Sequence, residues 1–515
     1  MIVPLNQLSA SIVPAIVLFI LLGVALMVRY RKRAQYRYPP GPQTLPILGN
    51  MHQFPIEYQA QKLAEWGQKY GDIVFANFFW TPTIILNSRE AAEALLEKRS
   101  AKYSDRPRFT LLNEMMGWDH AVNLMPYGRR SRKHRKILLD ALMVKSALVS
   151  YRPMVRRETA LLLSGLRDDP DRNMDHLRRW SAALVFDLAY GHRPASVDDE
   201  LVDLAERLTV ETVVTGSPGS VLVDFFPLLK NVPAWIPGFG FKHQALHARL
   251  MLTELMDKPY NMVKDALYAG NARPSLTATL LEEAITRGTL TPEHVDDIKG
   301  IAVALLGAGS DTTFTAIKTF VLAMVLYPDV QKKAQEEIDR VVGSDRLPDF
   351  EDRDNLPYVE GVFKEVFRWN ATVPLGIPHR SSGSDVFDGY DIPEGAMIMP
   401  NIWWMTQNPQ IYDHPEMFSP DRYRGMSPEQ LARTDPRSVV FGFGRRICPG
   451  KNFADASIWY AIANMIATMN ISPAQDQYGR DIIPEPAFIS GFISHPKPFT
   501  CQFSVRSDKA YALIE

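Results

Sequence analysis

The chain has 515 residues, of which 46% are hydrophobic, and its 57 basic and 58 acidic side chains leave a formal net charge of −1. Such a chain can bury a large core, and its length alone would suggest about two to four domains. A charge balance this even provides no global field to gather nucleic acid or acidic substrates, so we expect no nucleic-acid binding. Its two cysteines are too few for a disulfide-stapled secreted fold and indicate a reducing compartment.

The first apolar segment predicts a membrane anchor. Residues 12–28 are uncharged and almost wholly apolar, which at about 1.5 Å per residue is near the lower limit for a transmembrane helix. Residues 1–11 carry no basic side chain, unlike a cleaved signal peptide. By the positive-inside tendency, the basic residues after the anchor keep the following chain in the cytosol and leave residues 1–11 as a lumenal tail. These basic residues are Arg29, Arg31, Lys32, Arg33 and Arg37.

Residues 29–42 form a basic, proline-rich hinge, because the run Tyr38-Pro39-Pro40-Gly41-Pro42 cannot continue a helix. Residues 43–515 are expected to form the main folded domain. Within it, residues 224–242 combine large apolar side chains with a scaffold broken by proline and glycine. This segment is equally compatible with a second, monotopic membrane contact and with buried loop packing.

The pattern of apolar residues in the main domain predicts a chiefly α fold with small β regions. Residues 73–87 read as a β-hairpin broken near Thr81-Pro82, and helical periodicity then dominates to about residue 358. Short strands and turns are expected over residues 380–400. A last β region is expected over residues 489–505, where Cys501 alternates with apolar residues as it would in a strand with one buried face.

The longest predicted helix begins at Thr291-Pro292, a favourable N-cap followed by proline, and ends at Tyr327 before a further proline. It would be about 50 Å long and, being apolar nearly all round, would cross the middle of the protein. Its centre contains two glycines, an acid and two hydroxyls, in the string Gly307-Ala308-Gly309-Ser310-Asp311-Thr312-Thr313. Each glycine costs about 1 kcal/mol relative to alanine, so this segment is a candidate functional site.

The ten residues 441–450, FGFGRRICPG, place Cys448 in a glycine-rich loop just before an apolar helix expected over residues 451–469. Glycine at position 442, 444 or 450 permits backbone angles that would let the loop lie close to a flat cofactor. We expect Arg445, Arg446 and the positive end of the helix to lower the pKa of the thiol, as would a bound metal. The alternative is a cysteine that packs as a small apolar side chain.

The spacing F-x-x-G-x-R-x-C-x-G resembles the haem-ligand signature of the haem-thiolate monooxygenases, the cytochromes P-450, and AGSDTT resembles their oxygen-binding helix. The resemblance implies one large helical unit, haem b with Cys448 as the axial ligand of its iron, and a locally widened helix in which Ala308 and Gly309 make room beside the iron. Thr312 would donate a hydrogen bond to bound oxygen, and Asp311 would feed protons from solvent. Alternatively, Thr312 bonds back to the Ala308 carbonyl and Asp311 pairs with a surface base.

Further elements of the family follow in order along the chain. Glu365 and Arg368 match its E-x-x-R element, and Arg422 would complete a structural triad around the haem loop. The haem carboxylates would be held by Arg446, His379 and Arg135, whereas Ser131 stands where the family usually has a tryptophan, so that one contact is missing or replaced. Residues that could line an apolar substrate pocket, or equally belong to the core, are Met115, Met116, Trp118, Ala304, Ala308, Val373, Leu375, Phe492 and Ile493.

No glycine-rich dinucleotide motif follows a strand, so electrons from NADPH must arrive through a separate flavoprotein reductase. The basic run 129–136 could dock it, although a solvated helix face is the default reading. The resemblance, which covers about residues 38 to 505, is closest to fungal microsomal members that act on secondary metabolites. It implies an endoplasmic-reticulum enzyme that hydroxylates or epoxidises an apolar small molecule such as a terpenoid or polyketide. A haem-thiolate isomerase or dehydratase, or a membrane haem sensor, are the alternative functions.

Overall fold

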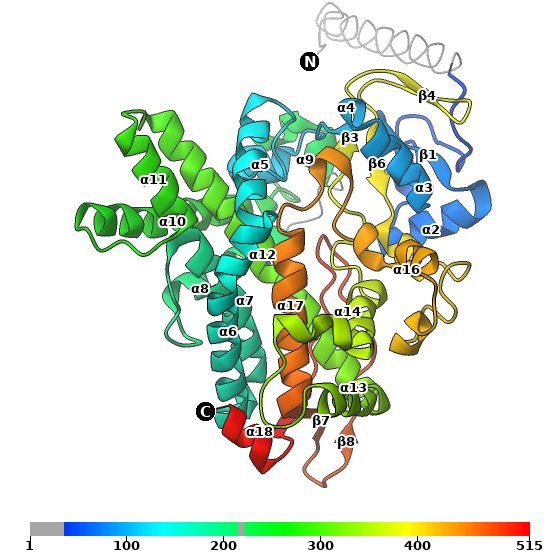
Figure 1. Ribbon diagram of the computed structural model, residues 1–515. Helices are drawn as coiled ribbons and strands as arrows, with labels where there is room; N and C mark the ends of the chain where they lie inside the picture. Colours follow the sequence, from blue (N-terminus) through cyan, green and yellow to red (C-terminus); the bar gives the residue numbers. More distant parts are fainter. Residues whose placement is uncertain (1–35, 215–220, 515) are drawn as a thin grey trace, which may run out of the picture.

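Helices make up most of the computed structural model, which describes residues 36–214 and 221–514 (Figure 1). The predicted anchor and the first half of the hinge, residues 29–35, lie outside these residues. The α-helices are α2 (Gln59–Tyr70), α3 (Arg89–Ala92), α4 (Ser100–Tyr103), α5 (Arg129–Leu142), α6 (Lys145–Asp168), α7 (Asn173–Tyr190), α8 (Glu200–Val214), α9 (Leu222–Phe225), α10 (Phe241–Tyr268), α11 (Leu276–Thr286), α12 (Pro292–Leu326), α13 (Pro328–Val341), α14 (Pro357–Trp369), α15 (Ile402–Gln407), α16 (Pro428–Thr434), α17 (Lys451–Thr468) and α18 (Asp508–Leu513).

The strands are short and confirm the prediction of small β regions. They are β1 (Ile73–Phe78), β2 (Thr81–Leu86), β3 (His379–Arg380), β4 (Asp385–Phe387), β5 (Tyr390–Ile392), β6 (Met397–Pro400), β7 (Met469–Gln475), β8 (Asp481–Ile482) and β9 (Cys501–Val505). Single-turn 3₁₀ segments occur between these elements, and π-helical turns cover η2 (Glu93–Lys98) and η3 (Thr110–Met115).

Helix α12 runs through the middle of the molecule, beside α17 in Figure 1. Its first turn is capped by the Thr291 side chain, which accepts a hydrogen bond from the His294 N–H (3.3 Å), and Pro292 occupies the first helical position. The predicted bounds are therefore confirmed. The helix is α-helical over its whole length, so the expected local widening near Ala308 is not present.

The glycines in the centre of α12 allow close packing. A Cβ atom at Gly307 would lie 3.0 Å from the Trp118 ring, and one at Gly309 would lie 2.7 Å from Val185 Cγ1 on α7. Helix α7 packs more extensively on α12 than any other element does. The space at Gly309 is thus filled by α7, and the expectation that this glycine makes room beside an iron is not supported.

Three small sheets surround the helices. The first has the order β1-β2-β6-β3, in which β2 pairs antiparallel with β1 and parallel with β6. The β1–β2 hairpin is confirmed, but its turn lies at Phe79-Trp80, where Phe79 has a positive φ of 53°. Pro82 belongs to β2 instead of breaking it, so the predicted position of the break was wrong. The second sheet is β4-β5 and the third is β8-β7-β9.

The last sheet confirms the alternating pattern around Cys501. In β9 the side chains of Cys501 and Phe503 are buried, whereas Gln502 and Ser504 between them are exposed. Residues 489–500, which were expected to belong to the same β region, are instead mostly loop. This loop is held against α12 and α14 by hydrogen bonds described below.

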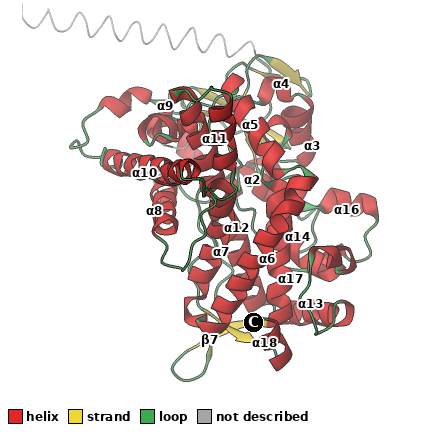
Figure 2. Ribbon diagram, turned by 60° about the vertical axis from the view of Figure 1, so that its left-hand side comes forward, coloured by secondary structure: helices red, strands yellow, loops and turns green. Residues whose placement is uncertain are grey.

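Figure 2 shows α12, α6, α7 and α17 as a bundle, with the small sheets at its ends. Among the described residues, α12 alone is apolar and long enough to cross a membrane, but 67% of its most apolar window is buried inside the protein. Burial of that kind is typical of a core helix. The predicted anchor, residues 12–28, lies outside the part of the chain that the structure describes.

The close packing of Gly309 against Val185 predicts that the effect of Gly309→Ala on the free energy of unfolding depends on the residue at position 185. Alanine is favoured over glycine in a helix by about 1 kcal/mol, whereas overpacking costs about 1–3 kcal/mol. Gly309→Ala should therefore destabilise the protein, but should stabilise it when Val185 has also been changed to alanine. Denaturant unfolding of the four proteins measures this, and stabilisation by Gly309→Ala alone would contradict the packing argument.

Candidate functional site

The loop of residues 441–450 turns by means of two glycines. Gly442 and Gly444 have φ values of 74° and 54°, which a residue with a Cβ rarely adopts. A Cβ at Gly444 would also lie 2.1 Å from the Leu96 carbonyl oxygen, so the loop needs glycine there for space as well. Gly450 has an ordinary φ of −84° and caps α17, so its proposed conformational role was wrong.

Cys448 lies half-buried where this loop enters α17. Burial raises the pKa of its thiol, against the opposing effects of the Gly450 and Lys451 N–H groups and the charges of Arg135 and Lys451. The N–H groups at the start of α17 do lower the pKa of the thiol, as predicted. Without a metal, however, the pKa is raised overall, whereas the prediction was that it would be lowered. The prediction did not include the effect of desolvation. Arg445 and Arg446 were also the wrong cations: Arg445 donates to the Tyr127 hydroxyl (3.1 Å) and Arg446 points at main-chain carbonyls.

Three buried arginines come together beside Cys448. Arg446 donates to the carbonyls of Ser104 (2.8 Å), Val122 (3.0 Å) and Met125 (2.8 Å). Arg135, on α5, donates to the Ile447 carbonyl (2.8 Å) and so ties α5 to the cysteine loop. Arg106 donates to the carbonyls of Asn123, Ile377 and Pro378 at 2.9, 2.6 and 2.9 Å.

The sequence analysis missed Arg106. The sequence gives only a weak indication that Arg106 belongs to a site. Arg106 precedes a proline, and residues 109–112 shortly after it are all buried. Only the fold shows that it joins Arg446 and Arg135, which are more than twenty residues away along the chain.

The electrostatics of this cluster indicate an anionic ligand. Burial lowers the pKa of Arg446 to about 10, and repulsion from Arg135 adds to the effect. Burial and the neighbouring arginines likewise hold the pKa of Arg106 well below its usual value. His379, buried and bonded through Nδ1 to the Tyr103 carbonyl (2.7 Å), has a strongly lowered pKa from burial and from Arg106. Four basic groups with little carboxylate nearby fit a buried dianion such as the two haem carboxylates.

Ser131 makes no part of this cluster. Its hydroxyl accepts a hydrogen bond from the Gly128 N–H (2.8 Å) and donates to the Gly128 carbonyl (3.1 Å), closing the first turn of α5. A helix cap is therefore what the serine contributes where the family usually has a tryptophan.

In the centre of α12, Thr312 and Asp311 both have partners. The Thr312 hydroxyl donates to the Ala308 carbonyl (2.6 Å), which is the back-bonded arrangement weighed as the alternative in the sequence analysis. The Asp311 carboxylate lies 3.1 Å from Nε2 of His495, a residue of the loop before β9. Asp311 thus pairs with a base, but with a half-buried histidine and not with a surface residue.

The predicted pocket residues do not gather in one place. Met115 and Val373 are only partly buried, Ala308 is exposed, and none of these three lines the cavity that Leu375 and Phe492 line. Met116, Trp118, Ala304 and Ile493 are buried within the described fold. Leu375 and Phe492 line a cavity of about 410 Å³ between α2, the end of α14 and the loop of residues 486–494. Aromatic and apolar side chains predominate in the rest of its wall, among them Trp369, Met399, Trp403 and Phe488.

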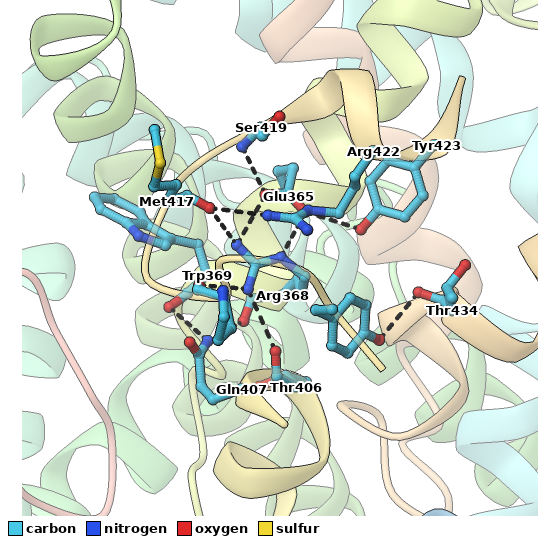
Figure 3. Close-up of polar contacts among 12 residues, drawn as sticks. Glu365, Arg368, Trp369, Thr406, Gln407, Met417, Ser419, Arg422, Tyr423 and Thr434 are labelled. Atoms are coloured by element: carbon cyan, nitrogen blue, oxygen red, sulfur yellow. Dashed lines mark hydrogen bonds and ion pairs between the residues drawn. The ribbon is translucent and has the colours of Figure 1, made fainter. Parts of the chain in front are cut away.

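Glu365, Arg368 and Arg422 form one buried network (Figure 3). Arg368 binds Glu365 through two nitrogens at 2.6 and 2.8 Å, and Arg422 Nε lies 3.0 Å from the same carboxylate. The Ser419 N–H and the Tyr423 hydroxyl complete the shell at 2.8 and 3.0 Å. Burial opposes the charge of Arg368, but the attraction of Glu365 outweighs it and raises the pKa of the arginine.

Arg368 and Arg422 also bind main-chain carbonyls of residues 413–417, which follow α15. Arg368 donates to the carbonyls of Pro415 and Met417, both at 2.7 Å, and Arg422 donates to that of Asp413 (2.7 Å). The network therefore joins α14 to the chain that leads toward the cysteine loop.

The basic run on α5 is only partly available to a partner. Arg130 and Lys133 bind Asp297 at 2.6 and 2.7 Å, and the buried His134 binds the same carboxylate at 2.9 Å, which fastens α5 to the start of α12. Arg135 faces the cysteine loop. The exposed cations left on α5 are Arg129, Arg132 and Lys136, with Arg445 of the cysteine loop near them through Tyr127.

The segment 224–242 is partly packed and partly exposed. Phe225 and Phe226 pack against Phe79, with ring centroids 5.3 and 4.9 Å apart. Leu228 and Trp235, by contrast, are 81% and 80% exposed. The two phenylalanines follow the buried-loop reading, and the two exposed side chains remain available to a membrane.

The comparisons with known proteins agree with this geometry. A family model described as Cytochrome P450 matches residues 39–503. The chain is 44% identical to Cytochrome P450 monooxygenase 136 of Postia placenta, over 99% of this chain and 96% of the relative. It is 45% identical to Cytochrome P450 monooxygenase 176 of the same fungus, over 95% and 94%, and 41% identical to Cytochrome P450 monooxygenase claR of Ampulloclitocybe clavipes, over 92% and 88%.

The buried network predicts a large effect from one substitution. Glu365→Gln leaves two guanidinium groups without their carboxylate, and breaking a buried pair costs about 3–5 kcal/mol. Glu65→Gln is the matched control, because Glu65 pairs with Lys62 at the same spacing but is 64% exposed; there the loss should stay below about 1 kcal/mol. Chemical unfolding compares the two, and equal losses would contradict the structural role.

Proposed function

The chain belongs to the cytochrome P450 family and is a monooxygenase, and from that premise we propose that it is a membrane-anchored fungal enzyme of secondary metabolism. It hydroxylates or epoxidises an apolar small molecule such as a terpenoid or polyketide. Dioxygen is the co-substrate, and electrons come from NADPH through a flavoprotein reductase.

The observation that carries this proposal is the presentation of Cys448 beside a buried basic cluster. The loop turns at two glycines, the helix N–H groups point at the sulfur, and Arg106, Arg135 and Arg446 supply positive charge for carboxylates, with the neutral His379 beside them. These are the groups that would hold haem b, with Cys448 as the axial ligand. When bound, the haem supplies the oxygen-activating chemistry, to which a thiolate contributes electron density.

The chain itself positions the substrate and moves protons. Thr312 uses its hydroxyl proton on the Ala308 carbonyl, so its oxygen accepts a hydrogen bond from a neighbouring water or substrate. Asp311 is half-buried next to it and carries the proton that must reach the reacting oxygen. Apolar side chains around the cavity of about 410 Å³ fit an apolar substrate on its way to the site, since the lining includes no residue of α12 or of the cysteine loop.

A membrane location is part of the same proposal and rests on the sequence. Residues 12–28 form the single anchor, with the basic residues after it on the cytosolic side of the endoplasmic reticulum. Leu228 and Trp235, exposed on the segment 224–242, provide a second contact with lipid. An apolar substrate would then partition into the membrane beside the enzyme.

The alternatives from the sequence have less support. The similar proteins are named as monooxygenases, which disfavours a non-catalytic haem sensor. An isomerase or dehydratase has no use for a carboxylate and a hydroxyl poised for oxygen protonation, and both are present in α12.

Expression with a fungal reductase tests the function. Membranes given NADPH, ¹⁸O-labelled dioxygen and a panel of terpenoids and polyketides should form products that carry one labelled oxygen atom. Cys448→Ser should abolish product formation and the spectral signature of a thiolate ligand, because a hydroxyl does not replace the thiolate. The matched control is Cys501→Ser, which changes the buried cysteine of β9 and should leave the spectrum unchanged. Unlabelled products, or an active Cys448→Ser enzyme, would contradict the proposal.

The exposed cations on α5 predict how the reductase docks. Combined reversal of Arg132 and Lys136 to glutamate should slow reductase-dependent reduction by about tenfold at low salt and weaken its salt dependence. Arg287→Glu, an exposed reversal at the end of α11, is the control and should have little effect. Stopped-flow absorbance measures the rate, and equal rates for all three proteins would exclude this face.

A further inference from the structure

Both ring nitrogens of His495 lie within hydrogen-bonding distance of groups on α12. Its Nε2 lies 3.1 Å from the Asp311 carboxylate, and its Nδ1 lies 3.0 Å from the Thr315 hydroxyl oxygen. The Thr315 hydroxyl also lies 2.8 Å from the main-chain carbonyl of Asp311. Asp311 and Thr315 are one turn apart on α12, so a single imidazole spans the side chain of one and the hydroxyl of the other.

These contacts determine where the protons are. A carbonyl oxygen only accepts, and in this arrangement the Thr315 hydroxyl donates its single proton to the Asp311 carbonyl. The Thr315 oxygen can then only accept from His495, which places a proton on Nδ1. A bare Nε2 and an ionised carboxylate cannot bond to each other, so a further proton lies between Nε2 and Asp311. The pair therefore holds one proton more than a neutral imidazole and a carboxylate would.

The loop that carries His495 is held firmly in place. The Ser494 N–H donates to the Thr372 carbonyl (2.8 Å), Asn370 donates to the Ser494 carbonyl (2.7 Å), and Lys318 donates to the Pro496 carbonyl (2.8 Å). The imidazole is thus positioned by the junction of α12 with the residues after α14, and not by chance contact of two mobile side chains.

The surrounding cations oppose a positive charge on His495, so an imidazolium there depends on the Asp311 carboxylate as its counter-charge. Lys318 lies on the same helix, and Arg178 on α7 stacks over Phe314, whose ring also faces His495. Arg178 is itself paired with Glu206 of α8 at 2.6 Å. The side chains of His495 and Asp311 are 19% and 16% exposed, which is enough for exchange with solvent and little enough to keep the pair intact.

We propose that His495 is a positioning residue that loads Asp311 with the proton used in oxygen activation. The N–H bond at Nε2 breaks as an O–H bond forms on Asp311, leaving the electron pair on the imidazole. Asp311 passes the proton toward Thr312 and returns to a carboxylate, and hydronium from solvent restores the imidazolium. This inference rests on the proposed role of Asp311, and its tests separate the two.

A spectroscopic test does not depend on turnover. In the diamagnetic carbon-monoxide complex of the reduced holoenzyme, labelled with ¹⁵N-histidine, one histidine should show both ring nitrogens protonated at neutral pH. That signal should disappear in His495→Gln, and in Asp311→Asn it should become that of a neutral ring. Thr315→Val should change its Nδ1 shift while His495 and Asp311 remain. A neutral His495 in the unchanged protein would overturn the inference.

Product yield per dioxygen consumed is the second measurement. His495→Gln should lower it about tenfold, within the usual contribution of a proton-transfer group, and should shift its pH profile. His192→Gln is the matched control, since His192 binds Asp199 at 2.9 Å with nearly the same exposure, 21% and 14%, away from α12; it should have no effect. If Asp311→Asn lowers the yield but His495→Gln does not, the proposed role of His495 is wrong and the proposed role of Asp311 stands. If Asp311→Asn has no effect, the proposed role of Asp311 fails first.

Discussion

The structure around the cysteine depends on one buried carboxylate. Glu365 receives hydrogen bonds or ion pairs from Arg368, Arg422, Tyr423 and Ser419, with no exposure of its own. The arginines use their remaining donors on carbonyls of the segment after α15, which has little regular structure. Since a charge this deeply buried is tolerated only when fully partnered, the network admits few alternative paths for that segment. The cysteine loop comes after this segment in the chain, so the network also restricts where the loop can lie.

A second buried group of charges has the opposite character. Around Glu365 the charges of both signs are matched, whereas Arg106, Arg135 and Arg446 repel one another, are stabilised mainly by carbonyls and lie beside a His379 whose pKa is strongly lowered. Arginines paired with a buried carboxylate stabilise the fold. Buried arginines without such a partner are suited to an anionic ligand. The contrast explains why two arginine clusters of similar burial have different functions, one holding the fold together and one suited to the carboxylates of haem.

Helix α12 links these parts to the chemistry. Its N-terminal turns are tied to α5 through Asp297, its glycines fit against Trp118 and Val185, and its centre reaches the C-terminal loop through His495. The strings that seemed unfavourable for a helix therefore serve two purposes. The glycines serve packing, and the acid and hydroxyls take part in the hydrogen bonds from which we propose a path for protons.

Short-range patterns in the sequence determined most of the regular elements and the loop that presents Cys448. The N-cap and prolines that bound α12, the alternation in β9 and the glycines before Cys448 act within a few residues, so they could be read without a fold. The same holds for Glu365 and Arg368, one helical turn apart. The exact turn of the first hairpin could not be read, because Phe79 has a positive φ that residues with a Cβ rarely adopt, and its ring packs against Phe225 and Phe226, which are distant in the sequence.

Tertiary structure alone decided which distant groups share an environment. Arg106 joined the basic cluster, His495 met Asp311 across 184 residues, and Val185 filled the space at Gly309. It also reversed the expected shift of the Cys448 pKa, because the cost of burial depends on everything that excludes water from the thiol. Local propensity acts over one or two turns of chain, whereas desolvation and charge depend on distances in space, and those exist only once the chain has folded.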